Sequence, residues 1–314
     1  MRIAVFGAGG IGGYLGARLA QVGEDVTLIA RGAHLSAIRR DGLRVDSTKG
    51  DFVMRPALAT DDPTEVGSVD VVILGVKAWQ VVEAVDAIRP MIGPETAVVP
   101  VQNGVDAPSQ VAEALGREHV LIGLCYIRGR IVGPGHIRHT VEVEPNVYLG
   151  EMDNARSRRL EQLREAFERS NMSVVVPEDI HVALWEKLVA AGTFAGLGAV
   201  TRMPIGVWRS LPQTRKMSEQ GGHEAVKVAQ ACGINLSADY VEYLKGVRDR
   251  FAPDYSPSLQ QDIIDGRPSE LEVWFGTVVR LGREVGVETP VNEFIYNTLL
   301  PQEMRARGHL EFPG

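Results

Sequence analysis

The segment that decides the fold opens the chain, where Met1-Arg2-Ile3-Ala4-Val5-Phe6 runs directly into Gly7-Ala8-Gly9-Gly10-Ile11-Gly12. The apolar run Ile3–Phe6 predicts a buried strand, and the apolar spacing from Ile11 to Val22 predicts a helix after the glycines. The glycines follow the pattern GxGxxG, which binds a dinucleotide when it joins a strand to a helix. This context favours a dinucleotide site over a glycine-rich turn without a ligand, which is the alternative.

Each position of the motif has a separate physical reason. Gly7 permits a tight turn, Gly9 lets a pyrophosphate approach the backbone, and Gly12 lets the helix pack closely on the strand. Gly10 and Ile11 lie at the predicted helix N-terminus, where backbone N–H groups and the helix dipole attract an anion. We therefore expect these five residues to bind the cofactor.

The residue after the second predicted strand, Val26–Ile29, indicates which dinucleotide is used. An NAD site places an acidic residue here to bind the ribose hydroxyls, but this chain has Ala30-Arg31. Arg31 offers a cation that can pair with a 2′-phosphate, with His34 and Arg39 as expected helpers. The sequence therefore predicts NADP(H), and a plain surface arginine is the alternative.

The rest of the chain predicts two domains. Further strands, followed by helices, are expected at Val69–Leu74, Ala97–Val101 and Val120–Ile127, with antiparallel strands at the sheet edge between Ile131 and Leu149. After Pro177 strand signals nearly vanish, and helices are expected at about 177–199, 211–232, 238–250, 269–285 and 291–305. The fold class is α/β, with a Rossmann-type doubly wound sheet over residues 1–176 followed by an all-helical substrate and dimerisation domain over 177–314.

One of these helices has a predicted start. Ser269-Glu270-Leu271-Glu272 has the form of a capping box, and apolar residues recur at helical spacing from Leu271 to Val285. We therefore expect a long helix to begin at Ser269.

Composition excludes several classes of protein. The chain has 314 residues, 45% hydrophobic and 23% charged, which indicates a globular protein, and its net charge of −7 disfavours nucleic acid as a partner. The longest nearly apolar run, Leu188–Val200, is too short to span a membrane, and the first residues do not resemble a signal peptide. Cys125 and Cys232 match neither a disulfide framework nor a zinc site, and the seven histidines form no HExxH, so we expect a cytoplasmic protein without a metal.

Polar residues follow two predicted strands at the edge where an open parallel sheet binds ligands. Lys77 follows Val69–Leu74 closely, and Asn103 follows Ala97–Val101. Asn103 is expected to hydrogen-bond to cofactor or substrate, while a turn formed by the Asn103-Gly104 pair is an equal alternative. Lys77 has the parallel alternative of an exposed lysine at a helix start.

The order of these motifs resembles that of the ketopantoate reductase (2-dehydropantoate 2-reductase) family. The resemblance rests on the glycine motif with Arg31, Val76-Lys77-Ala78, Val101-Gln102-Asn103-Gly104, Trp185-Glu186-Lys187-Leu188, Ser258–Asp262 and Glu270. It covers essentially the whole chain. It implies NADPH-dependent reduction of a 2-oxo acid, with the active site in a cleft between a Rossmann domain and a helical domain.

The resemblance also assigns residue roles. It makes Lys187 the general acid and Glu270 a carboxylate that positions substrate, and it places Asn103, Lys77 and Ser258 on the nicotinamide and substrate side. Hydride addition to a ketone develops negative charge on oxygen, which an ammonium group can stabilise and protonate. Taken alone, Lys187 on an apolar helix would more often be a surface lysine with a buried stem.

Three positions depart from the family pattern and predict a different substrate. Ala191 and Ala195 stand one and two turns after Lys187, where the family carries asparagines, and Tyr255 stands where another asparagine is common. A pocket lined by these residues leaves a substrate hydroxyl unpaired and favours a more apolar carbonyl compound than ketopantoate.

Two other functions fit parts of the sequence. An NADP-dependent β-hydroxyacid or secondary-alcohol dehydrogenase also joins a Rossmann domain to helices. A non-catalytic NADPH-sensing regulator would keep the glycines and Arg31 but would have no need for Lys187, Ser258 and Glu270 together. The apolar helical domain makes a homodimer a further expectation.

Overall fold

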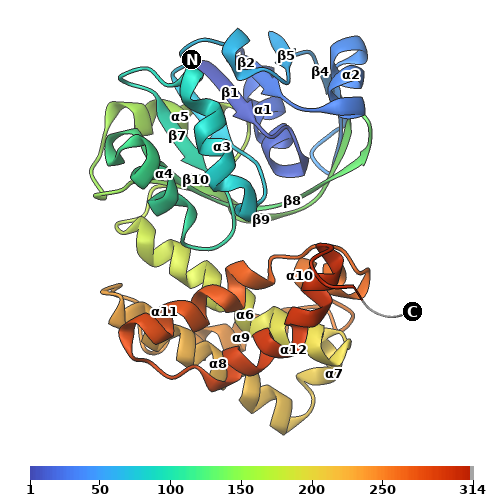
Figure 1. Ribbon diagram of the computed structural model, residues 1–314, viewed down its shortest axis with the longest axis vertical. Coiled ribbons are helices and arrows are strands. Elements are labelled where there is room, and N and C mark those ends of the chain that lie inside the picture. Colours follow the sequence, from blue (N-terminus) through green and yellow to red (C-terminus); the bar gives the residue numbers. More distant parts are fainter. Residues whose placement is uncertain (312–314) are drawn as a thin grey trace. The chain divides into compact units, whose positions relative to one another are not determined.

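The protein, represented by a computed structural model, divides into two compact units, and the structure describes residues 1–311 apart from the side chains of residues 141–146 (Figure 1). The first unit comprises Met1–Gln102 and Asp106–Ile180, and the second comprises Asn103–Val105 and His181–Gly314. The structural division thus falls after residue 180, whereas the sequence-based division falls after residue 176. The structure also assigns residues 103–105 to the second unit. Each unit has its own hydrophobic core.

The first unit contains a five-stranded parallel sheet with the order β5-β2-β1-β6-β7. Its strands are β1 (Arg2–Phe6), β2 (Asp25–Ile29), β5 (Leu58–Thr60), β6 (Val71–Leu74) and β7 (Ala97–Pro100). These strands are short apolar runs because helices and a second sheet cover both faces. The chain leaves β1 toward β2 on one side and returns as β6 on the other, so the switch point lies between β1 and β6. The predicted doubly wound α/β domain is confirmed.

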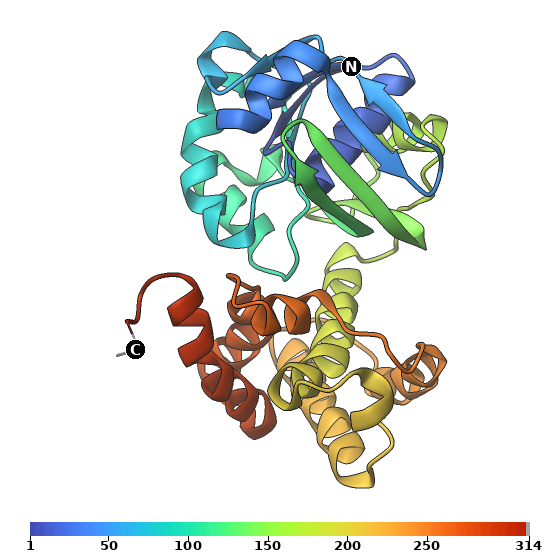
Figure 2. The same ribbon diagram turned by 90° about the vertical axis from the view of Figure 1, so that its right-hand side faces the viewer.

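A second sheet contains β3 (Leu43–Ser47), β4 (Phe52–Met54), β8 (Leu121–Gly133), β9 (His136–Glu151) and β10 (Val174–Val175), as Figure 2 shows for the β8–β9 hairpin in green and β3–β4 in blue. The prediction that Val120–Ile127 extends the parallel sheet was wrong. Only Val120 forms a parallel bridge, to Val98, and β8 then pairs antiparallel with β9. The physical reason is the tight turn at residues 134–135, because two strands joined by so short a turn run antiparallel.

The helices of the first unit are α1 (Gly10–Gln21), α2 (Gly32–Asp41), α3 (Val81–Ile88), α4 (Ala107–Leu115) and α5 (Arg158–Arg169), with short 3₁₀ turns η1 (Pro63–Glu65), η2 (Ala78–Gln80), η3 (Arg89–Met91) and η4 (Arg117–His119). Helix α1 packs against strands of both sheets. Its residues Tyr14, Leu15 and Leu19 are therefore fully buried. This burial fixes the position of the glycine loop that precedes α1.

The second unit is helical throughout its described residues, as predicted. It is built from α6 (Ile180–Thr201), α7 (Ile205–Trp208), α8 (Pro212–Ala231), α9 (Tyr240–Arg250), α10 (Ser258–Ile264), a π-helical turn η5 (Glu272–Gly276), α11 (Thr277–Val285) and α12 (Pro290–Ala306). Its core is formed around large buried residues such as Trp208 and Phe275. None of the helices in residues 1–311 is long and apolar enough to cross a membrane.

The predicted capping box at Ser269 was wrong in its second half. Ser269 Oγ accepts the Leu271 N–H at 3.2 Å, but the Ser269 N–H donates to both carboxylate oxygens of Glu303, at 3.1 and 3.0 Å. Glu272 accepts the hydroxyl of Tyr296 at 2.6 Å instead of reaching back to Ser269. A buried carboxylate from α12 replaces the local partner, which sequence spacing alone does not reveal.

Candidate active site

The glycine loop lies at the carboxyl end of β1, beside the switch point of the parallel sheet. Gly7 has a φ of 97°, and a Cβ there would lie 2.9 Å from the carbonyl carbon of Gly75 and from the amide nitrogen of Val76. A Cβ on Gly12 would collide with the carbonyl of Gly7. A Cβ on Gly9 would have no heavy atom within 4 Å, so the space above this peptide is open.

The hydrogen bonds of the loop show which N–H groups a ligand can use. Gly7 and Ala8 both donate their N–H groups to the carbonyl of Ile29, at 3.2 and 3.0 Å. The next N–H groups, at the N-terminus of α1, have no partner within the helix, and its first turn carries no acidic residue. A half-buried backbone with open space beside Gly9 and a favourable helix dipole fits the pyrophosphate of a dinucleotide.

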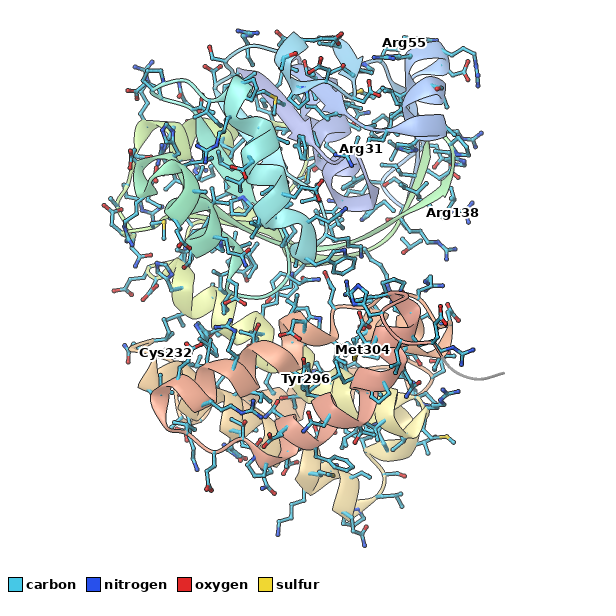
Figure 3. The ribbon with its side chains drawn as sticks, viewed as in Figure 1. Arg31, Arg55, Arg138, Cys232, Tyr296 and Met304 are labelled. Atoms are coloured by element: carbon cyan, nitrogen blue, oxygen red, sulfur yellow. The ribbon has the colours of Figure 1, made fainter. Side chains whose placement is uncertain are left out.

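Arg31 stands directly after β2, at the N-cap of α2, where Figure 3 labels it. It is exposed, and within residues 1–311 its side chain has no hydrogen-bond or ion-pair partner. The end of β2 carries no carboxylate that would bind ribose hydroxyls. These surroundings fit a 2′-phosphate.

The two expected helpers of Arg31 have other partners. The Gly135 N–H donates to Nδ1 of His34 at 3.0 Å, so the neutral ring carries its proton on Nε2 and donates it to the Ala8 carbonyl, 2.9 Å away. His34 thereby connects the glycine loop to the turn between β8 and β9. Arg39 donates to the Ala59 carbonyl at 2.8 Å and lies 3.8 Å from Asp61. Their predicted role as phosphate ligands is therefore not supported.

The loop after β6 forms the other side of the switch point. Lys77 is exposed, and its ammonium lies 5.7 Å from the centre of the Trp79 ring. Its backbone N–H donates to Oε1 of Gln80 at 3.2 Å, at the start of η2. This geometry places Lys77 at a helix start and leaves its predicted role in cofactor binding open.

In the second unit, Asn103 and Glu270 are in direct contact although they are 167 residues apart in the chain. Asn103 Nδ2 donates to Glu270 Oε2 at 2.7 Å. Gly104, with a φ of 89°, makes this approach feasible, because a Cβ there would lie 2.5 Å from Cγ1 of Val273 in η5. The Asn103 amide is therefore used by a partner distant in sequence, beyond any role in a local turn.

Lys187 lies on α6 and is half-buried, while Trp185 and Leu188 of the same helix are buried in the core of the second unit. Glu186, the preceding residue, is also half-buried, and burial raises the pKa of its carboxyl. Ala191 is half-buried and Ala195 is only 3% exposed, within the core of the second unit. Ala195 therefore supplies a methyl group to the core rather than an open polar surface.

An aromatic cluster occupies the same face of α6 as Lys187. Phe194 follows Lys187 by two helical turns, and its ring centre lies 5.2 Å from that of Phe251 in an edge-to-face arrangement. Tyr255 stacks on Phe251 with centres 4.5 Å apart and planes 15° apart. Ser258, the first residue of α10, is exposed.

The predicted site residues fall into two groups. The glycine motif, Arg31 and Lys77 lie in the first unit, and the other predicted residues, from Asn103 to Glu270, lie in the second. The structure brings Asn103 and Glu270 together, and the catalytic and binding roles of all these residues stay predictions. Sequence reasoning missed two residues that order the first group, His34 as a connector and Gln102, whose amide binds the backbone after β6. For Gln102 the only signal was its place beside Asn103.

Comparisons with known proteins agree on one family. The family model described as "Ketopantoate reductase PanE/ApbA" matches residues 3–154, and its companion, "Ketopantoate reductase PanE/ApbA C terminal", matches residues 179–303. A 2-dehydropantoate 2-reductase of Mesorhizobium japonicum is 32% identical over 312 residues, covering 92% of this chain and 94% of that protein.

Solved structures show the same likeness in three dimensions. The crystal structure of a PanE/ApbA family ketopantoate reductase from Ralstonia eutropha is similar with a TM-score of 0.88 and 28% identity, covering 98% of this chain and 100% of that one. That of a 2-dehydropantoate 2-reductase from Methylococcus capsulatus has a TM-score of 0.89 and 29% identity, covering 98% of both chains.

Proposed function

Since this chain belongs to the ketopantoate reductase family, and is thus an oxidoreductase acting on a CH–OH or C=O group with a nicotinamide cofactor, we propose that it uses NADPH to reduce a 2-oxo acid or related ketone more apolar than ketopantoate. The family supports the reductase over the NADPH-sensing regulator that the sequence also allowed. The β-hydroxyacid or secondary-alcohol dehydrogenase differs mainly in substrate, and the kinetic test below distinguishes it.

Residues of the first unit would hold the cofactor. The open backbone at Gly9 and the N-terminus of α1 would bind the pyrophosphate, and Arg31 would pair with the 2′-phosphate. When bound, the reduced nicotinamide supplies a hydride to the carbonyl carbon of the substrate.

Residues of the second unit would handle the proton and orient the substrate. The Lys187 ammonium would donate its proton to the carbonyl oxygen as negative charge develops there. The hydrogen bond between Asn103 and Glu270 is the observation that supports a substrate-orienting role for this pair, because it joins residues of two separate motifs. It also fixes the orientation of the amide and of the carboxylate, whose other atoms could then bind the substrate. Asn103 and Glu270 would thus orient the substrate for Lys187.

The substrate preference rests on what lies along the Lys187 face of α6. Ala191, which is half-buried, and the stacked rings of Phe251 and Tyr255 would offer apolar surface to a substrate, while Ala195 adds a methyl group to the core. Ala191, Ala195 and Tyr255 stand where the family pattern has amide groups. A hydroxyl group on the substrate would find no partner among these side chains, and an unpaired buried hydroxyl is costly. A larger, more apolar acyl group would pack better there.

Steady-state kinetics with a panel of 2-oxo acids and ketones test the proposal. NADPH oxidation should be fastest with apolar or aryl 2-oxo acids and slow with ketopantoate. A kcat/KM for ketopantoate of about 10⁴ M⁻¹s⁻¹ or more would refute the substrate preference. Activity only with NADP⁺ and secondary alcohols or β-hydroxyacids would favour the alternative dehydrogenase.

We further propose a cytoplasmic homodimer that binds neither membrane nor nucleic acid. Exposed apolar side chains on the helical unit, including Tyr243 and Phe294, support self-association. Sedimentation equilibrium at micromolar concentration should give twice the mass of the chain, 34.1 kDa. A monomer mass at that concentration would refute the dimer.

A further inference from the structure

The side chain of Gln102 lies where the backbone pairing of β6 with β7 ends. That pairing runs to Leu74 and Pro100, and the Val101 N–H adds a last bond to the Leu74 carbonyl at 3.3 Å. Beyond it, Gln102 Nε2 donates to the carbonyls of Leu74, at 2.5 Å, and Val76, at 3.0 Å. The side chain therefore continues the ladder past the end of the strand.

The orientation of this amide is determined by its partners. Turning the amide round would place Oε1 against two carbonyl oxygens, so both N–H groups must face Leu74 and Val76. Gln102 is only 8% exposed, and its Oε1 has no hydrogen-bond partner among the residues that the structure describes. Burying an amide with an unpaired oxygen costs free energy, and the two hydrogen bonds that its nitrogen donates offset this cost.

The peptide held by Gln102 contacts the glycine loop on its other side. Gly75 donates its N–H to the Phe6 carbonyl at 2.8 Å, and a Cβ on Gly75 would lie 2.7 Å from the Gly7 carbonyl and 2.8 Å from Cα of Gly12. The backbone after β6 thus lies between Gln102 and the loop. This is the switch point, where an open α/β sheet binds its ligand.

We propose that Gln102 is a positioning residue for the dinucleotide, a role that rests on the proposed function. By binding the Leu74 and Val76 carbonyls, it fixes the intervening Gly75 against Gly7 and Gly12 and so holds the N–H groups at the start of α1 in the geometry that binds pyrophosphate. Without its two donors, the Val76 carbonyl turns toward water and the glycine loop loses its support. Cofactor affinity should then fall while turnover at saturating cofactor changes little, because Lys187 belongs to the other unit.

The first experiment measures the dissociation constant of NADP⁺ by fluorescence titration of the full-length chain. Gln102→Leu, which keeps the side-chain size but removes both donors, should raise the constant about tenfold. Gln110→Leu is the matched control, since Gln110 on α4 of the same unit is also partly buried with an unpartnered Oε1. It should change the constant less than twofold.

A second variant gives a readout that a purely structural role would not change. In Gln102→Glu at pH 8, an ionised carboxylate faces the Leu74 and Val76 carbonyls and repels them, whereas at pH 5 a protonated carboxyl can donate to one of them. Lys77 is the charged residue of the loop that follows β6, and its side chain is exposed. The ratio of variant to wild-type dissociation constants should therefore fall several-fold from pH 8 to pH 5.

The outcomes separate the two proposals. If the wild type binds neither NADP⁺ nor NAD⁺, the proposed function fails. If the wild type binds NADP⁺ but both Gln102 variants bind equally well at every pH, only the role of Gln102 is overturned. If Gln102→Leu does not fold, the pH-dependent ratio for Gln102→Glu decides.

Discussion

Arg31 and two basic residues of α2, His34 and Arg39, differ in what surrounds them. His34 uses both ring nitrogens for backbone groups, and Arg39 is bound to Ala59 and lies near Asp61. Because these two side chains already have partners within the protein, they would add little to the affinity for a phosphate. Arg31 has no such partner in the part of the chain that the structure describes. We therefore propose that the choice between the two dinucleotides depends on the Arg31 side chain.

Replacing Arg31 should abolish the preference for the phosphorylated cofactor. Arg31→Ala should raise the dissociation constant of NADPH about 10- to 100-fold, because a hydrogen bond to a charged group contributes about 1.5–3 kcal/mol. The constant for NADH should stay within about twofold. Arg40→Ala is the control, since Arg40 on the same helix pairs with Asp41 at 2.7 Å. Tenfold tighter binding of NADH than NADPH by the wild type would refute the assignment.

Lys187 should affect turnover rather than cofactor binding. Lys187→Ala should lower kcat by about 100-fold or more, because the proton donor to the developing alkoxide is lost. NADPH affinity should barely change, since the proposed phosphate-binding residues lie in the other unit. Lys216→Ala, at an exposed position on α8, should leave both quantities unchanged. Unchanged turnover of Lys187→Ala would remove this lysine from the mechanism.

At the scale of elements, the hydrophobic pattern of the sequence predicted the strands and helices that depend on interactions between residues close in the chain. β1, α1 and the long helices α6, α8 and α12 follow from apolar periodicity, and their predicted bounds agree with the structure within a few residues. The antiparallel pairing expected between Ile131 and Leu149 is present, between β8 and β9, but these strands belong to a second sheet whose other strands were not predictable in this way. Strand β3 pairs with β9, and Arg44 lies opposite His136, so its existence depends on a partner some 90 residues away.

The same distinction between local and long-range interactions applies to the residues of the candidate site. The glycine motif and Arg31 could be found from spacing alone, because a single βαβ unit determines their surroundings. No spacing rule relates Asn103 to Glu270, and only the likeness to a family suggested that they act together. The partners of His34 and Gln102 are backbone N–H and C=O groups of other segments, which leave no pattern in side-chain identity.

The π-helical turn η5 gives a prediction for alkaline pH. Tyr296 of α12, labelled in Figure 3, donates its hydroxyl proton to Glu272 in η5, and burial together with this carboxylate raises its pKa to about 12. The unfolded value is 10.0, so the stabilisation by the neutral phenol is complete below pH 10 and is lost between pH 10 and 12. The wild type should therefore lose stability relative to Tyr296→Phe across this interval.

Urea unfolding at pH 8, 10 and 11.5 measures this difference. The free energies of unfolding of wild type and Tyr296→Phe should differ by about 1 kcal/mol at pH 8 and converge toward pH 11.5. Tyr243, which is 62% exposed, provides the control, and Tyr243→Phe should show no such pH dependence. A constant difference for Tyr296→Phe would show that its hydroxyl has an ordinary pKa.

At the scale of the whole molecule, two separate cores support the two groups of site residues. The core of the first unit surrounds the parallel sheet and α1, while that of the second surrounds α6, α8 and α12. A mutation in one core can therefore weaken cofactor binding without disturbing the helix that carries Lys187. The chain crosses between the units at Gln102 and Asn103, so the support of the glycine loop and the partner of Glu270 are adjacent residues.

This division predicts where cofactor binding stabilises the protein. NADPH at 100 times its dissociation constant should stabilise whatever it binds by about 2.7 kcal/mol. If the first unit supplies the pyrophosphate and 2′-phosphate sites, hydrogen exchange should slow most in Gly7–Gly13 and in α2, and less in the core helix α8. Arg31→Ala should lose most of this protection and Lys187→Ala should keep it. Equal protection of α8 and the glycine loop would show instead that the units unfold as one body, so that affinity and catalysis could not be altered separately.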